Sequence, residues 1–401
     1  MTQTSNSTTT VDRIVFTDFI RVALKKVVYL LIIALLPVLG CIEEYNPKGV
    51  NETSGILVIE GKITNGESVI YLRESVGLTE QLFGNETVDN ALVYIEKDNG
   101  EQLPGLFRGK GAYVISTGEL DAGTKYRLMV KYNGEEYVSE FLTPVITSEM
   151  DSLTYSKKGL GEPVVFHAYS HDNNSEGSRY YTWSFREIWE VKAELFADYG
   201  YMNGDYQHFS LATSENLYYC WARDSSKSIL LGTSDKLSEN VIYQKTITEI
   251  PCDNRRLSVL YYINVEQNQI SKEAYDYFYN LKKNVEQTGS IFSPIPSEMK
   301  GNIRCTTNPA ISVIGFIYAS TTTTKELYVD GSYYEPKITL ISEDGEFKIF
   351  DDCSGLVSGI REMGYSYYMY PALFAPNRCV NCTVAGNASK DRPDFWPNNH
   401  Y

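Results

Sequence analysis

The chain has 401 residues, of which 43% are hydrophobic and 22% are charged, and this is the composition of a globular protein with ample apolar material for a core. Its 51 acidic residues outnumber its 36 basic residues, which gives a formal net charge of −15 at pH 7. Such a surface repels phosphate backbones and no basic stripe interrupts it, so nucleic-acid binding is disfavoured.

Residues 1–40 read as an N-terminal extension followed by a lipoprotein signal peptide. Lys25 and Lys26 form a positive n-region, and residues 27–39 form an apolar run shorter than the ~20 residues that span a membrane. The run ends in VLGC, which resembles a bacterial lipobox and implies that Cys41 is acylated. A buried helix that ends in a free cysteine is the alternative, and it leaves Lys25 and Lys26 unexplained.

Residues 41–54 form a polar, lipidated tether without periodicity. Glu43 and Glu44 lie directly behind the lipidated cysteine. Acidic residues at this place resemble the surface-export signals of lipoproteins from the Bacteroidetes phylum. We therefore expect a lipid-anchored protein of the outer membrane, displayed on its outer face.

Residues 55–146 are predicted to form a small immunoglobulin- or transthyretin-like β-sandwich. Asn65-Gly66 and Asn133-Gly134 supply the positive φ values of tight hairpin turns. Six short strands are expected with no helix between them, at residues 57–63, 68–72, 91–96, 113–116, 126–132 and 137–142. Their order resembles that of the carboxypeptidase-regulatory domains of outer-membrane proteins, which implies a spacer or docking module without catalytic residues.

Residues 147–401 are predicted to form a larger β-rich domain with one clear helix. In the stretch 179–192, period-two alternation puts Arg186, Ile188, Glu190 and Lys192 on one face of a strand. The opposite face is made of Tyr181, Trp183, Phe185, Glu187 and Trp189. A helix should begin after Ser271 as N-cap and end near Gly289. Its core stripe is expected at Ala274, Phe278, Leu281 and Val285.

The mature chain as a whole resembles the Bacteroidetes lipoproteins of the domain-of-unknown-function 4249 group. The resemblance implies an accessory lipoprotein associated with a TonB-dependent outer-membrane transporter. The stretches that carry it are CIEEYNP (41–47), LVIEGKIT (57–64), RYYTWSFREIWE (179–190), CW (220–221), ILLGTSDKLSEN (229–240), RRLSVLYYINVEQ (255–267), GSIFSPIPSEMKGNIRC (289–305) and RPDFWP (392–397).

Six cysteines follow Cys41, and an even count in an exported protein predicts disulfides. Cys353 with Cys379 or Cys382 is the first pairing expected, because it closes a short loop. The CVNC stretch at 379–382 could instead be a redox motif or half of a zinc site, but no helical stripe follows it and no second pair of ligands is evident. The candidates are Cys220, Cys252, Cys305, Cys353, Cys379 and Cys382.

No sequence motif of an enzyme, metal site or cofactor is evident. The chain has no GxSxG elbow, no HExxH helix and no glycine-rich phosphate loop. Glu187 with an aspartate elsewhere could form a glycosidase pair, but an acid-rich chain contains many such pairs by chance. We therefore predict a protein that is not an enzyme and that needs no cofactor.

A cluster of aromatic residues is the best candidate for a partner or ligand surface. On a strand, the side chains of this cluster alternate between two faces, so one pair should meet solvent or a partner unless both faces are buried. The cluster consists of Tyr365, Tyr367, Tyr368 and Tyr370. Two functions remain open: a binding or accessory subunit of a TonB-dependent transporter, and a structural or adhesive surface lipoprotein without a transported ligand.

Overall fold

The computed structural model of the chain describes residues 55–76, 86–197, 199–202, 205–208, 210–211, 217–287, 300–335, 365–369, 373–384, 386–397 and 400. The chain divides into two compact units, Met1–Glu52 and Thr53–Tyr401, and the second contains every described residue. The expected signal peptide, Cys41, the tether, Cys353 and Tyr370 lie outside the described residues. Within the described part, no helix is long and apolar enough to cross a membrane.

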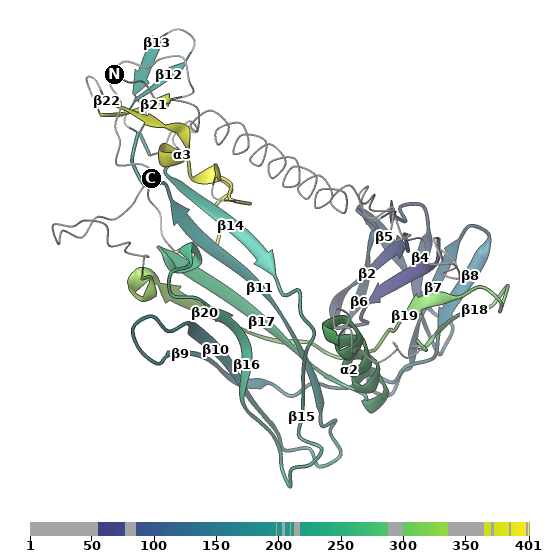
Figure 1. Cartoon of the computed structure of the whole chain (residues 1–401). Helices are drawn as coiled ribbons and strands as arrows, with labels where there is room; N and C mark the ends of the chain where they lie inside the picture. Colours follow the sequence, from purple (N-terminus) through teal and green to yellow (C-terminus); the bar gives the residue numbers. More distant parts are fainter. Residues whose placement is uncertain are drawn as a thin grey trace, which may run out of the picture. The chain divides into compact units, whose positions relative to one another are not determined.

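The protein is mainly β, as the sequence predicts, and its first part forms a ten-stranded sheet (Figure 1). The spatial order is β18-β8-β7-β4-β5-β6-β2-β1-β19, with β3 paired to β2. Its strands from the first part of the chain are β1 (Leu57–Gly61), β2 (Gly66–Glu74), β3 (Glu86–Thr87), β4 (Leu92–Lys97), β5 (Gln102–Gly109), β6 (Ala112–Gly118), β7 (Tyr126–Tyr132) and β8 (Glu135–Ser139).

One hydrophobic core lies inside this ten-stranded sheet. Ile59 of β1, Ile70 of β2 and Ile95 of β4 are each 0% exposed, and each contributes about 1.5 to 3 kcal/mol by leaving water. Tyr137 of β8 packs into the same core although β8 and β1 lie far apart in the strand order. The sheet therefore folds over on itself, which is the sandwich that the sequence predicts.

All six predicted strands of this region are present, but β3 and β5 were not predicted. β5 contains Pro104 and Gly105, which argue against a strand when read in sequence. Its residues are exposed or half-buried, so no buried alternation reveals it. Neighbouring β4 and β6 supply its hydrogen-bond partners instead.

Two short strands from the second half of the chain complete the ten-stranded sheet. β18 (Ile303–Cys305) pairs antiparallel with β8, and β19 (Val313–Gly315) pairs parallel with β1. In Figure 1 they are the green strands among the purple and blue ones. We expected residues 147–401 to form a separate domain, but this sheet takes strands from both sides of that boundary. They cover the edges of β1 and β8, which would otherwise leave backbone groups unpaired.

Gly315 brings β19 closer to β1 than a side chain would allow. Its φ is +146°, and a Cβ at this position would lie 2.1 Å from the carbonyl oxygen of Ile59. Gly315→Ala should therefore lower the free energy of unfolding by about 2 to 3 kcal/mol, from backbone strain and overpacking together. Gly159→Ala is the control, because a Cβ there meets nothing within 4 Å. Equal urea midpoints for the two variants would contradict this account.

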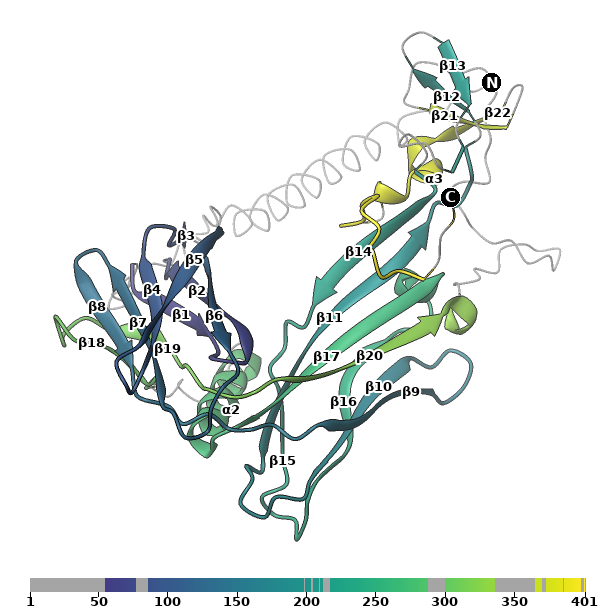
Figure 2. The same cartoon turned by 180° about the vertical axis from the view of Figure 1, so that it is seen from behind.

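The second part of the chain is built on two facing sheets. Figure 2 shows the long strands β11, β17 and β20 of the five-stranded sheet side by side. That sheet consists of β14 (Tyr219–Ser225), β11 (Tyr180–Lys192), β17 (Leu260–Ile270) and β20 (Thr323–Asp330) in this order, with β15 (Leu230–Thr233) on β11. The three-stranded sheet consists of β16 (Asn240–Ile250), β10 (Val164–Asp172) and β9 (Met150–Lys157).

Side chains from these two sheets share one core. Phe166 of β10 lies against Tyr261 of β17, with ring centroids 5.3 Å apart. The predicted alternation of β11 is confirmed, because Tyr181, Trp183 and Glu187 share a face and are all buried, whereas Trp189 of the same face is half-buried. The opposite face of the five-stranded sheet therefore points away from this core.

A small four-stranded sheet combines two segments that are remote from each other in the chain. It consists of β13 (Asp205–His208), β12 (Tyr199–Met202), β21 (Tyr365–Met369) and β22 (Leu373–Pro376). Short helical turns are η3 (Arg255–Leu257), η4 (Gly331–Tyr333), α3 (Asn377–Val380) and η5 (Cys382–Val384).

The predicted helix is α2 (Lys272–Gln287). The backbone N–H of Ala274 donates to Ser271 Oγ at 3.2 Å, which confirms the predicted N-cap. Ala274 is buried and Phe278 packs in the same cluster. The prediction that Val285 belongs to the core is wrong, because it is 66% exposed and the helix has passed beyond that cluster. Gly289 lies outside the described residues.

Two linking segments tie the ten-stranded sheet to the five-stranded sheet. Val145 pairs in parallel with Ser320, and Thr147 Oγ1 lies 3.0 Å from Ser320 Oγ. The backbone N–H of Gln269 donates to Thr147 Oγ1 at 2.9 Å, and the N–H of Ser148 donates to Gln269 Oε1 at 2.6 Å. Because most of these groups are buried and paired with one another, they hold both segments in one arrangement.

Candidate functional site

A cleft of about 500 Å³ lies where the ten-stranded sheet meets the outer face of the five-stranded sheet. This volume is within the range of small-ligand pockets, ~300 to 1,000 Å³. Its walls come from β1, β2, β11, β17, α2 and the linking segment before β20. The lining residues are Gly61, Lys62, Thr64, Asn65, Glu67, Val69, Tyr71, Ser184, Arg186, Glu266, Phe278, Tyr318 and Thr322.

Charged side chains from three segments meet in this cleft. Lys62 follows β1 directly, and its ammonium donates to Glu266 Oε2 at 3.1 Å and to Asn268 Oδ1 at 2.9 Å. Arg186 of β11 donates to the other oxygen of Glu266 at 3.1 Å. The side chains of Lys62 and Glu266 are only 21% and 18% exposed, whereas Arg186 is 78% exposed. One carboxylate thus holds two cations from different sheets.

Burial and charge act in opposite directions on these groups. Burial lowers the pKa of Lys62, and the nearby Glu266 carboxylate only partly offsets this. Burial also raises the pKa of Glu266, but the charges and hydrogen bond of Lys62 together with Arg186 outweigh it, so the net pKa lies below its usual range. Glu266 therefore stays ionised, and its contribution to stability is lost only as the pH falls through that lowered pKa.

Neutral polar groups form a second part of the cleft. Thr64 Oγ1 lies 2.8 Å from Thr322 Oγ1, which also accepts from Asn268 Nδ2 at 2.7 Å. The backbone N–H of Thr322 donates to Asn65 Oδ1 at 2.8 Å. These bonds join the turn after β1 to the linking segment before β20, so they fix the position of both.

Aromatic rings form the third part. Tyr71 of β2 is 40% exposed, and the rings of Phe278 and Tyr318 meet edge to face with centroids 5.8 Å apart. Burial, followed by the charge of Glu266, raises the pKa of Tyr318 well above its usual value, so its hydroxyl stays protonated. Among the described residues, no group hydrogen-bonds to this hydroxyl, so it keeps its capacity to donate and to accept a hydrogen bond.

Two other hollows are less suited to binding. One of about 600 Å³ is lined by Cys252, Pro251 and Glu335, but burial raises the pKa of the Cys252 thiol and keeps it protonated. One of about 490 Å³ is lined mainly by polar side chains beside His171, whose hydrogen bond with Asp151 is exposed. Neither joins charged, polar and aromatic groups as the cleft does.

The two buried carboxylates of β11 are structural. Glu187 is 2% exposed, accepts from Tyr261 Oη at 2.7 Å, and lies 2.8 Å from Arg256 Nη1. It lies in the core between the five-stranded and the three-stranded sheet. Glu190 is 0% exposed on the opposite face and accepts from Trp396 Nε1 at 3.0 Å and from His400.

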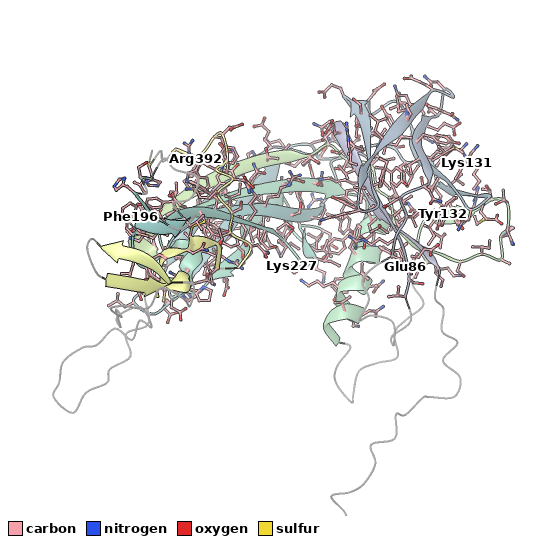
Figure 3. All side chains as sticks on the ribbon, turned by 90° about the horizontal axis from the view of Figure 1, so that it is seen from above. Glu86, Lys131, Tyr132, Phe196, Lys227 and Arg392 are labelled. Carbon is pink, nitrogen blue, oxygen red and sulfur yellow. A yellow bond between two sulfur atoms is a disulfide. The ribbon has the colours of Figure 1, made fainter. Side chains whose placement is uncertain are left out.

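A C-terminal segment, residues 386–397, covers part of the outer face of the five-stranded sheet. Trp396 is 2% exposed and packs with Trp221 and Tyr262. Arg392, labelled in Figure 3, belongs to this segment, and Arg223 of β14 donates to the carbonyl oxygen of Asp391 at 2.7 Å. The RPDFWP stretch therefore anchors this segment to the sheet.

The cysteines differ from the prediction. The prediction that Cys220, Cys379 and Cys382 join disulfides is confirmed, because Cys220 is bonded to Cys382 and Cys379 is disulfide-bonded as well. Cys382 therefore does not pair with Cys353. The CVNC stretch is thus neither an internal redox pair nor a set of free thiolates. Cys252 and Cys305 are free and buried, so the prediction that they join disulfides is wrong. Cys305 lies in the core of the ten-stranded sheet and Cys252 lies beside Glu335, and each thiol is free among the described residues.

The predicted tyrosine surface is described only by its backbone. Tyr365 and Tyr367 belong to β21, as expected of a strand, and Tyr367 pairs with Tyr199 of β12. The orientation of the side chains of Tyr365, Tyr367 and Tyr368 lies outside the described features, so their role as a partner surface stays a prediction. The cleft could not be identified from the sequence, because its charged residues are remote from one another in the chain.

A family model, "Domain of unknown function (DUF4249)", matches residues 42–326. It extends over both parts of the fold, from the tether to the middle of β20. A search of curated proteins finds no match. The model covers most of the chain and agrees with the resemblance found in its sequence motifs. The chain belongs to the DUF4249 family.

Proposed function

We propose that this protein is an exported lipoprotein, anchored to the outer membrane through Cys41, which acts as a binding or accessory subunit of a TonB-dependent transporter. The observation that carries the binding role is the cleft between the ten-stranded sheet and the five-stranded sheet. Its charged, polar and aromatic groups converge from segments that the linking network holds in place. A pre-arranged site of this kind loses little entropy when it takes up a ligand.

The sequence supports the anchor. The apolar run 27–39 ends at the lipobox-like VLGC, and the family model begins at residue 42, directly after Cys41. Acylation of Cys41 would hold the folded part beside the membrane on the polar tether 41–54. An integral partner in the same membrane then meets a high effective concentration of this protein, so even a modest interface is occupied.

The proposal predicts lipid labelling and co-purification. Cells that express a tagged chain should incorporate an alkyne-labelled palmitate into it, and an integral β-barrel should co-purify under mild detergent. Cys41→Ser should lose the label entirely, because only the thiol accepts the lipid, and should recover much less of the barrel.

Cys252→Ser is the matched control, since Cys252 is a buried free thiol and its loss should leave the label unchanged. Label on Cys41→Ser would refute the anchor. A labelled protein that brings down no barrel would reject the transporter role and favour a structural or adhesive surface lipoprotein.

A further inference from the structure

We propose that the cleft lined by Lys62, Glu266 and Tyr318 binds a neutral, polyhydroxylated ligand, an oligosaccharide chain. This inference deepens the binding role proposed above and rests on it, but it does not depend on the transporter. Three properties of the cleft point to this class of ligand: balanced charge, unused hydrogen-bonding capacity, and exposed aromatic rings.

The charges of the cleft are balanced within it. Lys62 and Arg186 both contact Glu266, and Glu67 is a second acidic residue of the lining. A phosphate or carboxylate ligand would be repelled by Glu266 and Glu67, and a cationic ligand would be repelled by Lys62 and Arg186. A neutral ligand leaves the ion pairs intact.

Hydrogen-bonding capacity remains after the internal bonds are counted. The Lys62 ammonium has three protons, and two of them are used by Glu266 and Asn268. Each oxygen of Glu266 can accept more than one bond, and the Tyr318 hydroxyl can both donate and accept. The cleft therefore holds a donor in Lys62, an acceptor in Glu266, and in Tyr318 a hydroxyl that can do both. A sugar hydroxyl, which donates and accepts at the same time, matches this set.

The rings supply the apolar part of the site. One face of a sugar ring carries only C–H groups, and aromatic side chains combine large apolar faces with polar edges. Tyr71 is 40% exposed, and the Tyr318 ring is held edge to face by Phe278. Tyr71 thus offers an exposed apolar face at the cleft, and Tyr318 brings a hydroxyl close to Glu266.

The test begins with the purified full chain on an array of neutral oligosaccharides that contains α- and β-glucans, xylans, mannans and galactans. Sulfated and uronic-acid oligosaccharides serve as ionic comparators. The strongest neutral oligosaccharide is then titrated by calorimetry. Tyr318→Phe should weaken its binding about 3- to 10-fold, as expected for one neutral hydrogen bond, and Lys62→Met about tenfold or more.

Two matched controls separate binding from folding. Tyr243→Phe makes the same change at a tyrosine that is 78% exposed on β16, and Lys97→Met removes a cation from the surface pair with Glu101. Both should bind like the unaltered protein, and Tyr318→Phe should melt at the same temperature as Tyr243→Phe. The proposal would be overturned if the controls weakened oligosaccharide binding as much as Tyr318→Phe does.

Absence of saturable binding to any neutral oligosaccharide, or binding of ionic ones alone, would also overturn it. These outcomes are distinct from failure of the proposed function. If a barrel co-purifies but no sugar binds, this inference is refuted and the transporter role still stands. If Tyr318→Phe weakens sugar binding but no barrel co-purifies, this inference is supported and the transporter role is refuted.

Discussion

Replacing Arg256 by alanine should lower the free energy of unfolding by about 3 to 5 kcal/mol at pH 7, because it leaves a buried carboxylate without its counter-charge. Glu187 is 2% exposed, and Arg256 Nη1 lies 2.8 Å from its Oε1. The guanidinium also covers the ring of Trp189, 5.0 Å from its centroid. The Tyr261 hydroxyl and the charge of Lys227 would remain to stabilise the carboxylate.

The loss should become smaller in acid. Burial raises the pKa of Glu187, and the hydrogen bond from Tyr261 and the charge of Arg256 oppose this rise. Without Arg256 the folded-state pKa should rise further above the unfolded value. The folded protein then takes up the proton first, so lowering the pH through that pKa stabilises it relative to the unfolded chain. Urea unfolding at pH 7 and pH 5 measures the difference.

Arg255→Ala is the matched control for this substitution. Arg255 precedes Arg256 in the chain, but it pairs with Glu194 at the surface. The side chain of Arg255 is 46% exposed and that of Glu194 is 40% exposed. Such a pair contributes about 0 to 1 kcal/mol. Equal losses for the two variants, or a loss in Arg256→Ala that does not change with pH, would refute the assignment of a buried ion pair.

Removing the Cys220–Cys382 disulfide should lower the free energy of unfolding by about 4 kcal/mol. The two cysteines are 162 positions apart, and cross-links that close long loops restrict the unfolded chain most. The double variant Cys220→Ala with Cys382→Ala should also release the segment that carries Trp396. Limited proteolysis should then trim the C-terminal segment of the variant before that of the unaltered protein.

The free cysteines provide the control. Cys252→Ala removes a buried thiol without breaking a disulfide, so it should cost about 1 kcal/mol and leave the C-terminal segment resistant to protease. Non-reducing peptide mapping should recover the peptides of Cys220 and Cys382 joined. Separate peptides, or a double variant as stable as Cys252→Ala, would contradict the disulfide.

Local features of the fold could be predicted from the sequence. Alternation placed Tyr181 and Trp183 on the buried face of β11, and the polar residue before α2 identified Ser271 as its cap. These signals depend on neighbours within a few positions. β5 escaped prediction because its hydrogen bonds come from neighbouring strands, while its own residues include Pro104 and stay accessible to solvent.

The cleft and the disulfides depend on contacts between remote positions. Lys62 and Glu266 are 204 positions apart, and neither carries a local signal that it meets the other. An even number of cysteines suggested complete pairing, but the fold places Cys305 and Cys252 in separate surroundings. Neither spacing nor count reveals which thiols come close.

The strand order of the ten-stranded sheet also constrains how the chain can mature. Synthesis proceeds from the N-terminus, yet Leu57 of β1 finds its partner Val313 only when most of the chain has been made. Pairings so distant along the chain form slowly, and the open edges of β1 and β8 meanwhile offer templates for wrong association. A fragment cut at residue 146 would keep both edges open permanently. Fusions and truncations should therefore retain residues 300–320, and chaperones have a long interval in which to act.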